Sequence, residues 1–311
     1  MSTAPARTPD SPYAWLRLAV ALIVGTMACA GSWTVVVVIP TIQAEFATDR
    51  AGASVAYTMM MVGFATGTVL MGRVADRYGT VLPVAAAALL LGGGYLLAAW
   101  APVLPVFVLA HLVIGLGTAG GFALMMADIS HWFVKRRGLA VVIAACGSYL
   151  AGVVFPLTMN HLIPLYGWRT THVIIGAVIV LAILPLAPMF RTKPSQATLA
   201  AAETAAAAGR ADLGLEPRTL QILLTVAGFS CCMAMAMPQV HIVAYCADLG
   251  YGVARGAEML SLMLGLGIFS RIASGFLADR IGGAGTLAIG SLMQGLALLL
   301  YLFFNGLSSL Y

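Results

Sequence analysis

The stretch GRVADRYGT, Gly72 to Thr80, closes a long apolar run with two glycines and an Asp-Arg pair. Nearly the same letters return late in the chain as GFLADRIGG, Gly275 to Gly283, again directly after an apolar run. The two copies carry their glycines and their Asp-Arg pair in the same register. Such a repeat predicts that the chain is built from two similar halves, each with an equivalent turn at the same place.

The composition excludes a water-soluble globular protein. Of the 311 residues, 61% are hydrophobic and only 9% are charged, whereas a soluble surface needs far more charge. Runs of about 18 or more apolar residues predict transmembrane helices, because a hydrocarbon core of about 30 Å takes roughly 20 helical residues to cross. The sequence therefore predicts an all-α membrane protein.

Nine apolar runs of the length that a bilayer requires follow one another along the chain. They cover residues 15–40, 54–75, 81–100, 103–129, 138–163, 169–190, 219–244, 256–278 and 284–304. One long polar segment, 191–218, separates the sixth run from the seventh. The expected organisation is an N-terminal six-helix bundle over 1–190, a cytoplasmic linker over 191–218 and three further helices over 219–311.

The placement of Lys and Arg indicates the orientation. With a cytoplasmic N-terminus, most cations of the connections lie on the cytoplasmic side, and only Arg50, Arg169 and Arg255 lie on the other. Cytoplasmic loops carry this excess of positive charge in membrane proteins. The asymmetry also accounts for the net charge of +5 without a nucleic-acid partner. We expect a multi-pass protein of the inner membrane, with no removable signal peptide.

The repeated motif lies at the expected cytoplasmic end of the second span of each half. Its glycines permit a tight turn and close backbone approach, and Asp76 can pair with a basic residue or a helix N-terminus of the opposite bundle. Such a contact would close the cytoplasmic side until transport breaks it. A solvated local ion pair is the alternative. The candidate gating residues of the motif are Gly72, Asp76, Arg77, Gly79, Gly275, Asp279, Arg280 and Gly282.

Both copies of the motif resemble the loop signature of the major facilitator superfamily of transporters. HWFVKRRGLAVVIAACGSYLAG, His131 to Gly152, resembles the helix 5 signature of its monocarboxylate-transporter-like group, and MPQVHIVAYCADLG in the seventh span is similar to bacterial members. The resemblance implies the superfamily fold, with a complete N-terminal six-helix bundle and three helices of the C-terminal bundle. Because members usually have twelve helices, the chain is expected to be truncated after helix 9.

Arg271 is the first candidate for substrate binding. It lies inside the eighth span, where the matching residue of the first half is Thr68. A charge at this depth is costly and marks a functional site by default, and a guanidinium matches a carboxylate in bidentate fashion. By the resemblance, an Arg four residues before the motif glycine, here Gly275, binds the substrate carboxylate. Snorkelling or a structural ion pair is the alternative.

Proton coupling has no complete set of family residues in this chain. Monocarboxylate-type members often carry an acidic residue one turn before the Arg, and this chain has Gly267 there. They also often carry a Lys in helix 1, and this chain has Trp33 near that place. His241 in the seventh span resembles a substrate-site His of bacterial relatives and can titrate near neutral pH. His111 in the fourth span is a second proton-coupling candidate. For both histidines, a packed neutral imidazole is the alternative.

Three more residues are singled out by their positions. Trp33 and Tyr149 are expected to line the substrate cavity, with aromatic packing as the alternative. Asp128, at the cytoplasmic end of the fourth span, is expected by the resemblance to pair with Arg77 in the gate, and a plain loop carboxylate is the alternative. Small residues beside His111 predict close helix contact: Gly115, Gly117, Gly120 and Gly121.

The sequence contains no HExxH, GxSxG or P-loop motif, so we expect no enzyme, metal site or cofactor. We expect a secondary transporter of small organic anions that works by alternating access in the lipid bilayer, driven by protons or by anion exchange. A non-transporting fragment, sensor or partner subunit is one alternative. A drug exporter of the same superfamily is another, disfavoured because the first three spans hold no deep acidic residue. The oligomeric state stays open.

Overall fold

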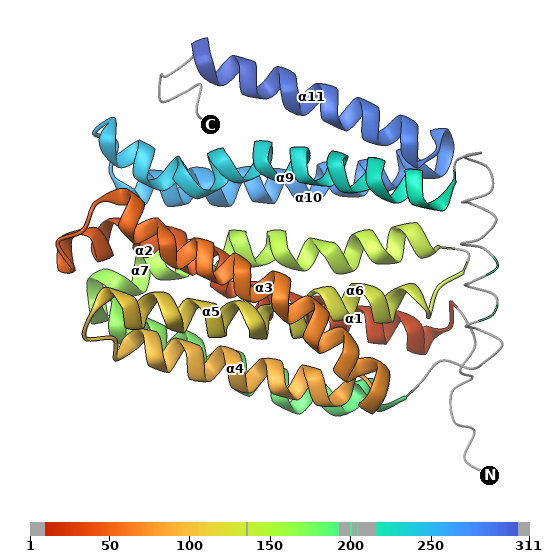
Figure 1. The fold of residues 1–311 in the computed structure, drawn as a ribbon, viewed down its shortest axis with the longest axis horizontal. Coiled ribbons are helices and arrows are strands. Elements are labelled where there is room, and N and C mark those ends of the chain that lie inside the picture. The colour runs from red at the N-terminus through yellow and green to blue at the C-terminus, as the bar shows by residue number, and fades with distance from the viewer. Residues whose placement is uncertain (1–9, 135, 193–199, 201–203, 205–215, 304–311) are drawn as a thin grey trace.

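A computed structural model shows residues 10–134, 136–192, 200, 204 and 216–303, with the side chains of 217, 237, 279, 301 and 302 left out. Every element in this part of the chain is a helix, and the long helices run roughly side by side (Figure 1). Eight helical stretches within these residues are long and apolar enough to cross a membrane. The expectation of an all-α membrane protein is confirmed.

The first and fourth spans are each made of two helices. The first consists of α1 (Pro12–Ala28) and α2 (Ala30–Glu45), which meet at Cys29. The fourth consists of α5 (Leu104–Gly121) and α6 (Ala123–Ser130), which meet at Phe122. In both spans the apolar sequence continues through the junction, so each pair serves as one crossing.

The repeated motif is a helix stop. In the first half α3 (Arg50–Tyr78) ends at Gly79, with φ 84° and ψ 172°, and α4 (Val81–Ala99) follows. In the second half α10 (Val253–Ile281) ends at Gly282, with φ 81° and ψ 162°. Only glycine adopts this backbone conformation readily. The tight turn predicted for Gly79 and Gly282 is therefore confirmed.

The fifth and sixth expected spans lie together in α7 (Arg137–Leu186). The helix is broken at Gly167, which has the non-helical angles φ 76° and ψ 161°. The short helix η1 (Ala187–Arg191) follows. The segments at both ends of this stretch contact the start of α1: the Val134 amide donates to Asp10, and the Tyr13 hydroxyl donates to Met189. The chain therefore reverses at Gly167, and the stretch accounts for two crossings.

Three helices follow the segment 193–215, which lies outside the described residues. They are α9 (Pro217–Asp248), α10 and α11 (Gly283–Phe303). We call the end of the molecule where α1 begins and η1 ends the linker end, and the opposite one the far end. The far-end portions of α9 and α10 are buried, whereas much of their linker-end portions is exposed. α11 lies at the outer edge of the molecule (Figure 1).

Glycines bring α5 into close contact with its neighbours, as predicted. A Cβ atom at Gly115 would lie 2.0 Å from the Met60 carbonyl oxygen of α3, and one at Gly117 would lie 2.8 Å from Leu91 of α4. Gly120 and Gly121 are equally crowded. The expectation fails at Gly72, because a Cβ atom there would meet nothing within 4 Å among the described residues.

Candidate substrate site and the contacts around it

A cavity of about 300 Å³ lies between α7 and α10. It is lined by Val142 and Tyr149 of α7 and by Gly267, Ser270, Arg271, Ser274, Gly275 and Ala278 of α10. The α10 residues recur at spacings of three and four and therefore share one face of that helix. The predicted binding residue Arg271 thus lines a hollow between α7 and α10.

The Arg271 guanidinium lies over an aromatic ring. Its central carbon is 4.2 Å from the centroid of the Tyr149 ring, well within the range of a cation–π interaction. Among the described residues, no carboxylate lies within ion-pairing distance of Arg271. A half-buried cation without an acidic partner is available to a negatively charged ligand.

Of the two predicted aromatic residues, Tyr149 and Trp33, only Tyr149 borders the cavity. Tyr149 lines the cavity, and its hydroxyl points to Met235 of α9, 3.9 Å from the sulfur. Trp33 does not line the cavity. It is buried, and its indole N–H donates to the Ser148 carbonyl at 2.8 Å, which ties α2 to the α7 turn that carries Tyr149. The structure places Tyr149 in the cavity lining, whereas the expectation that Trp33 lines the cavity is wrong, because its indole is used to join α2 to α7.

The two predicted histidines lie outside the cavity. His241 is half-buried on α9, six residues or about 9 Å of helix beyond Met235. His111 is fully buried within the N-terminal helices, where its Nδ1 bonds to the Phe107 carbonyl at 2.8 Å and its ring packs on Phe107. A second buried histidine, His172, packs against Phe107 as well. Sequence reasoning missed His172, because it has no motif around it.

Within the described residues, no ion pair of the repeated motif is seen. Asp76 and Arg77 are exposed, and neither has an ion-pair partner among the described residues. Arg280 is exposed as well, and the side chain of Asp279 lies outside the described part. Gly275 is buried, and a Cβ atom there would lie at an ordinary contact distance of 3.5 Å from Val142. The gating role of these residues stays a prediction.

Asp128 corrects the expected pairing. It does not pair with Arg77 but with Arg17 of α1, whose Nε and Nη2 donate to the two carboxylate oxygens at 2.7 and 2.8 Å. The exposed fractions of the two side chains are 1% and 8%. Arg77 instead points outward over the ring of its neighbour Tyr78. The physical reason is that α1 delivers Arg17 directly to the buried side of Asp128.

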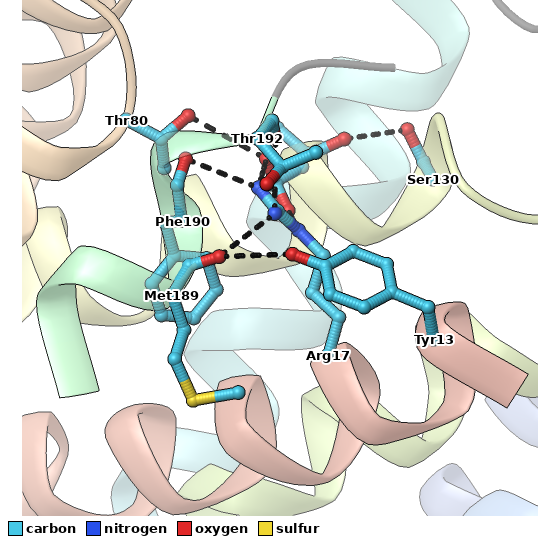
Figure 2. Close-up of polar contacts among 9 residues, drawn as sticks. Tyr13, Arg17, Thr80, Ser130, Met189, Phe190 and Thr192 are labelled. Carbon is cyan, nitrogen blue, oxygen red and sulfur yellow. Dashed lines mark hydrogen bonds and ion pairs between the residues drawn. The ribbon is translucent and has the colours of Figure 1, made fainter. Parts of the chain in front are cut away.

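Arg17 also binds the backbone that leads into the linker. Figure 2 shows its side chain reaching from α1 to the carbonyl groups of Met189, Phe190 and Thr192, with donor–acceptor distances of 3.2, 3.4 and 3.1 Å. The guanidinium lies 4.8 Å from the Trp132 ring centroid and 5.0 Å from that of Phe190. Arg17 is one of the cations that the sequence places on the cytoplasmic side. Its position within an apolar run, where a charge is costly, is the signal that could have marked it as a buried partner.

A second interhelical ion pair lies at the far end. Arg50 at the start of α3 donates to Asp248 at the end of α9 at 2.6 Å, and both side chains are partly exposed. The pair lines a hollow of about 380 Å³, together with Gln43 and Ala247 among others. The pair joins a helix that precedes the expected linker, 191–218, to one that begins near its end and continues beyond it. No sequence motif indicated it.

Comparison with known families decides the identity of this helical assembly. A sequence profile of the Major Facilitator Superfamily matches residues 21–311. The chain belongs to the major facilitator superfamily. It is therefore a multi-pass membrane protein, and its helices and repeated loops are those of a superfamily member.

Relatives within the superfamily carry different names. The chain is 26% identical to the agnestins efflux protein AgnL12 of Paecilomyces divaricatus, over 74% of this chain and 52% of the relative. It is also 26% identical to monocarboxylate transporter 4 of Gallus gallus, over 88% of this chain and 58% of the relative. The chain spans about half to two thirds of the length of the first curated relatives.

Solved structures share the fold. The proton:xylose symporter XylE bound to 6-bromo-6-deoxy-D-glucose aligns with a TM-score of 0.63 and 14% identity, over 86% of this chain and 70% of that chain. At this identity the likeness concerns the fold alone. It agrees with the expected superfamily fold.

Proposed function

We propose that this superfamily member, of the monocarboxylate-transporter-like group, moves a small organic anion across the inner membrane by alternating access. The observation that carries the proposal is Arg271, a half-buried cation that borders a cavity and has no acidic partner among the described residues. A bound carboxylate would supply the missing negative charge in bidentate geometry.

The contacts between the two groups of helices support the alternating-access part of the proposal. In the proposed cycle, residues 1–190 would move as one unit, residues 219–311 would belong to the other, and 191–218 would connect them. In this structure they are linked at the far end through Arg50 and Asp248, while Asp76 and Arg77 at the linker end are unpaired within the described residues. With a cytoplasmic N-terminus, the Arg50–Asp248 pair would hold the two groups together on the external side, which supports an inward-facing assignment.

Uptake and binding of labelled carboxylates test the proposal. We expect the reconstituted chain to bind or take up at least one of lactate, pyruvate, formate and oxalate, and Arg271→Ala to abolish that signal. Arg271→Lys keeps the charge but loses the planar fork, so we expect weakened binding. Arg218→Ala, which removes an exposed cation at the start of α9, serves as the control.

Two results would contradict the proposal. One is carboxylate binding that is unchanged in Arg271→Ala, and the other is an equal loss in Arg218→Ala. The coupling mode follows from the same vesicles. Acceleration by an inward proton gradient favours proton symport, with His241 as the protonatable candidate, and acceleration by internal unlabelled anion favours exchange.

A further inference from the structure

The ring of Tyr149 fills the space that a side chain at position 267 would need. Gly267 lies one helical turn before Arg271 on α10, and a Cβ atom there would lie 2.3 Å from Cε1 and 2.7 Å from Cδ1 of the Tyr149 ring. Contacts under 3.0 Å essentially never occur for real Cβ atoms. The ring of Tyr149 therefore lies against α10 at a place that is open only because residue 267 has no side chain.

From this place the ring covers one face of the Arg271 guanidinium, with 4.2 Å between the guanidinium carbon and the ring centroid. The N–H donors of a guanidinium lie in its plane, so an aromatic ring on the face leaves them able to bind a carboxylate edge-on. Stacking also removes rotational freedom that an arginine would otherwise lose when it binds a ligand.

We propose that Gly267 is a positioning residue, which admits Tyr149 onto α10 so that the ring holds Arg271 with its donors directed into the cavity. The inference rests on the proposed function, because it assigns a support to the proposed anion site. Gly267 acts through Tyr149 and not on the anion itself. Its replacement therefore weakens anion binding without altering the charge of the site.

The chain offers a matched control two residues away. A Cβ atom at Gly265 would meet only Val153, at an ordinary 3.6 Å. Gly267→Ala and Gly265→Ala each add one methyl group to the same helix. For lactate, we expect Gly267→Ala to raise KM or Kd about tenfold, the size of a desolvated cation–π contact, with the maximal rate unchanged. We expect Gly265→Ala to match the wild type.

A double-mutant cycle separates positioning from general packing. Tyr149→Phe keeps the π face, so we expect it to bind lactate nearly as the wild type does. Tyr149→Ala removes the ring, so we expect the loss seen in Gly267→Ala, and adding Gly267→Ala to Tyr149→Ala should change nothing further. Additive losses in the double variant would overturn the inference, as would equal effects of Gly267→Ala and Gly265→Ala.

The two proposals fail in different ways. Lactate binding that survives Arg271→Ala contradicts the anion site itself. Lactate binding that is lost in Arg271→Ala but intact in Gly267→Ala contradicts only the positioning role. Thermal unfolding in detergent accompanies each variant, and if Gly267→Ala unfolds, the comparison of Tyr149→Ala with Tyr149→Phe decides the role of the ring.

Discussion

Arg17 and Asp128 show how a charge pair is accommodated inside an apolar bundle. Nε and Nη2 of Arg17 donate to the two carboxylate oxygens of Asp128 at 2.7 and 2.8 Å. Its Nη1 donates to the backbone carbonyls of Met189 and Thr192. Such satisfaction of donors offsets the cost of removing two charges from water. The pair connects α1, α6 and the entry to the linker segment, so we interpret it as a permanent anchor.

Removing one partner of this anchor should be severe. In Arg17→Ala, Asp128 is left buried without a counter-charge, which we expect to cost about 3–5 kcal/mol of stability. Thermal unfolding of the purified protein measures the loss. The double variant Arg17→Met with Asp128→Leu removes both charges and should recover much of it. A double variant less stable than Arg17→Ala would contradict this account.

Arg271 illustrates the opposite case, a cation that keeps an aromatic face instead of an acid. Within the described residues, Arg17 is buried and paired with a carboxylate, whereas Arg271 is half-buried and has no acidic partner, and this contrast separates the anchor from the candidate binding site.

At the scale of the element, the chain uses glycine for two different purposes. Gly79 and Gly282 end α3 and α10 in a backbone conformation that other residues avoid. Gly115, within α5, has ordinary helical geometry and is required for close packing on α3 instead. The same residue type therefore has a conformational role at the helix ends and a packing role inside.

The helix stops should be sensitive to any side chain. In Gly79→Ala we expect a loss of about 1–3 kcal/mol, because alanine is strained at φ 84° and ψ 172°. Gly282→Ala should behave alike. Gly290→Ala, which adds a methyl group to open space within α11, should be neutral or stabilising. Equal melting temperatures for Gly79→Ala and Gly290→Ala would show that α3 does not need this stop.

Substitution of the packing glycine, Gly115, should be just as destabilising, but for a different reason. In Gly115→Ala the new Cβ atom would lie 2.0 Å from the Met60 carbonyl oxygen, so α3 and α5 must move apart, at a cost of about 1–3 kcal/mol. Gly93→Ala on α4 meets nothing within 4 Å and serves as the control. A melting temperature for Gly115→Ala as high as that of Gly93→Ala would refute the close contact.

At the scale of the whole molecule, the Arg50–Asp248 pair bridges the helices on either side of the linker segment. Both side chains are partly exposed, so the pair contributes no more than about 1 kcal/mol. A contribution of that size suits a contact that would break and form again in the proposed transport cycle, because it would bias the two conformations without locking one of them.

Charge reversal tests this bias. We expect Arg50→Glu to shift the population toward a far-end-open state by up to about fivefold, since 1 kcal/mol corresponds to that ratio. Spin labels at the exposed residues Ala51 and Leu249 report the change as a longer distance. The swap Arg50→Glu with Asp248→Arg should restore the original distribution. A distribution that stays the same in Arg50→Glu would remove the pair from the gate.

The amino-acid sequence by itself determined the all-helical membrane class, the repeated stops at Gly79 and Gly282, and the presence of a cation within the eighth span. The nine expected spans appear as eight membrane-length stretches in the described residues, because the fifth and sixth run together across Gly167. These features follow from local composition, because a hydrocarbon environment requires long apolar helices and a positive φ combined with an extended ψ, as at both stops, strongly favours glycine. Arg271 was detectable for the same reason, as a charge inside an apolar run.

Only the tertiary structure decided which side chains meet. Arg17 and Asp128 are 111 residues apart, and nothing in either neighbourhood distinguishes this pairing from the expected one between Arg77 and Asp128. The stacking of Tyr149 on Arg271 likewise depends on the space above Gly267, which is created by the packing of α7 on α10. Partner choice is a property of the packed helices, whereas the cost of placing each residue in a membrane can be read from the chain.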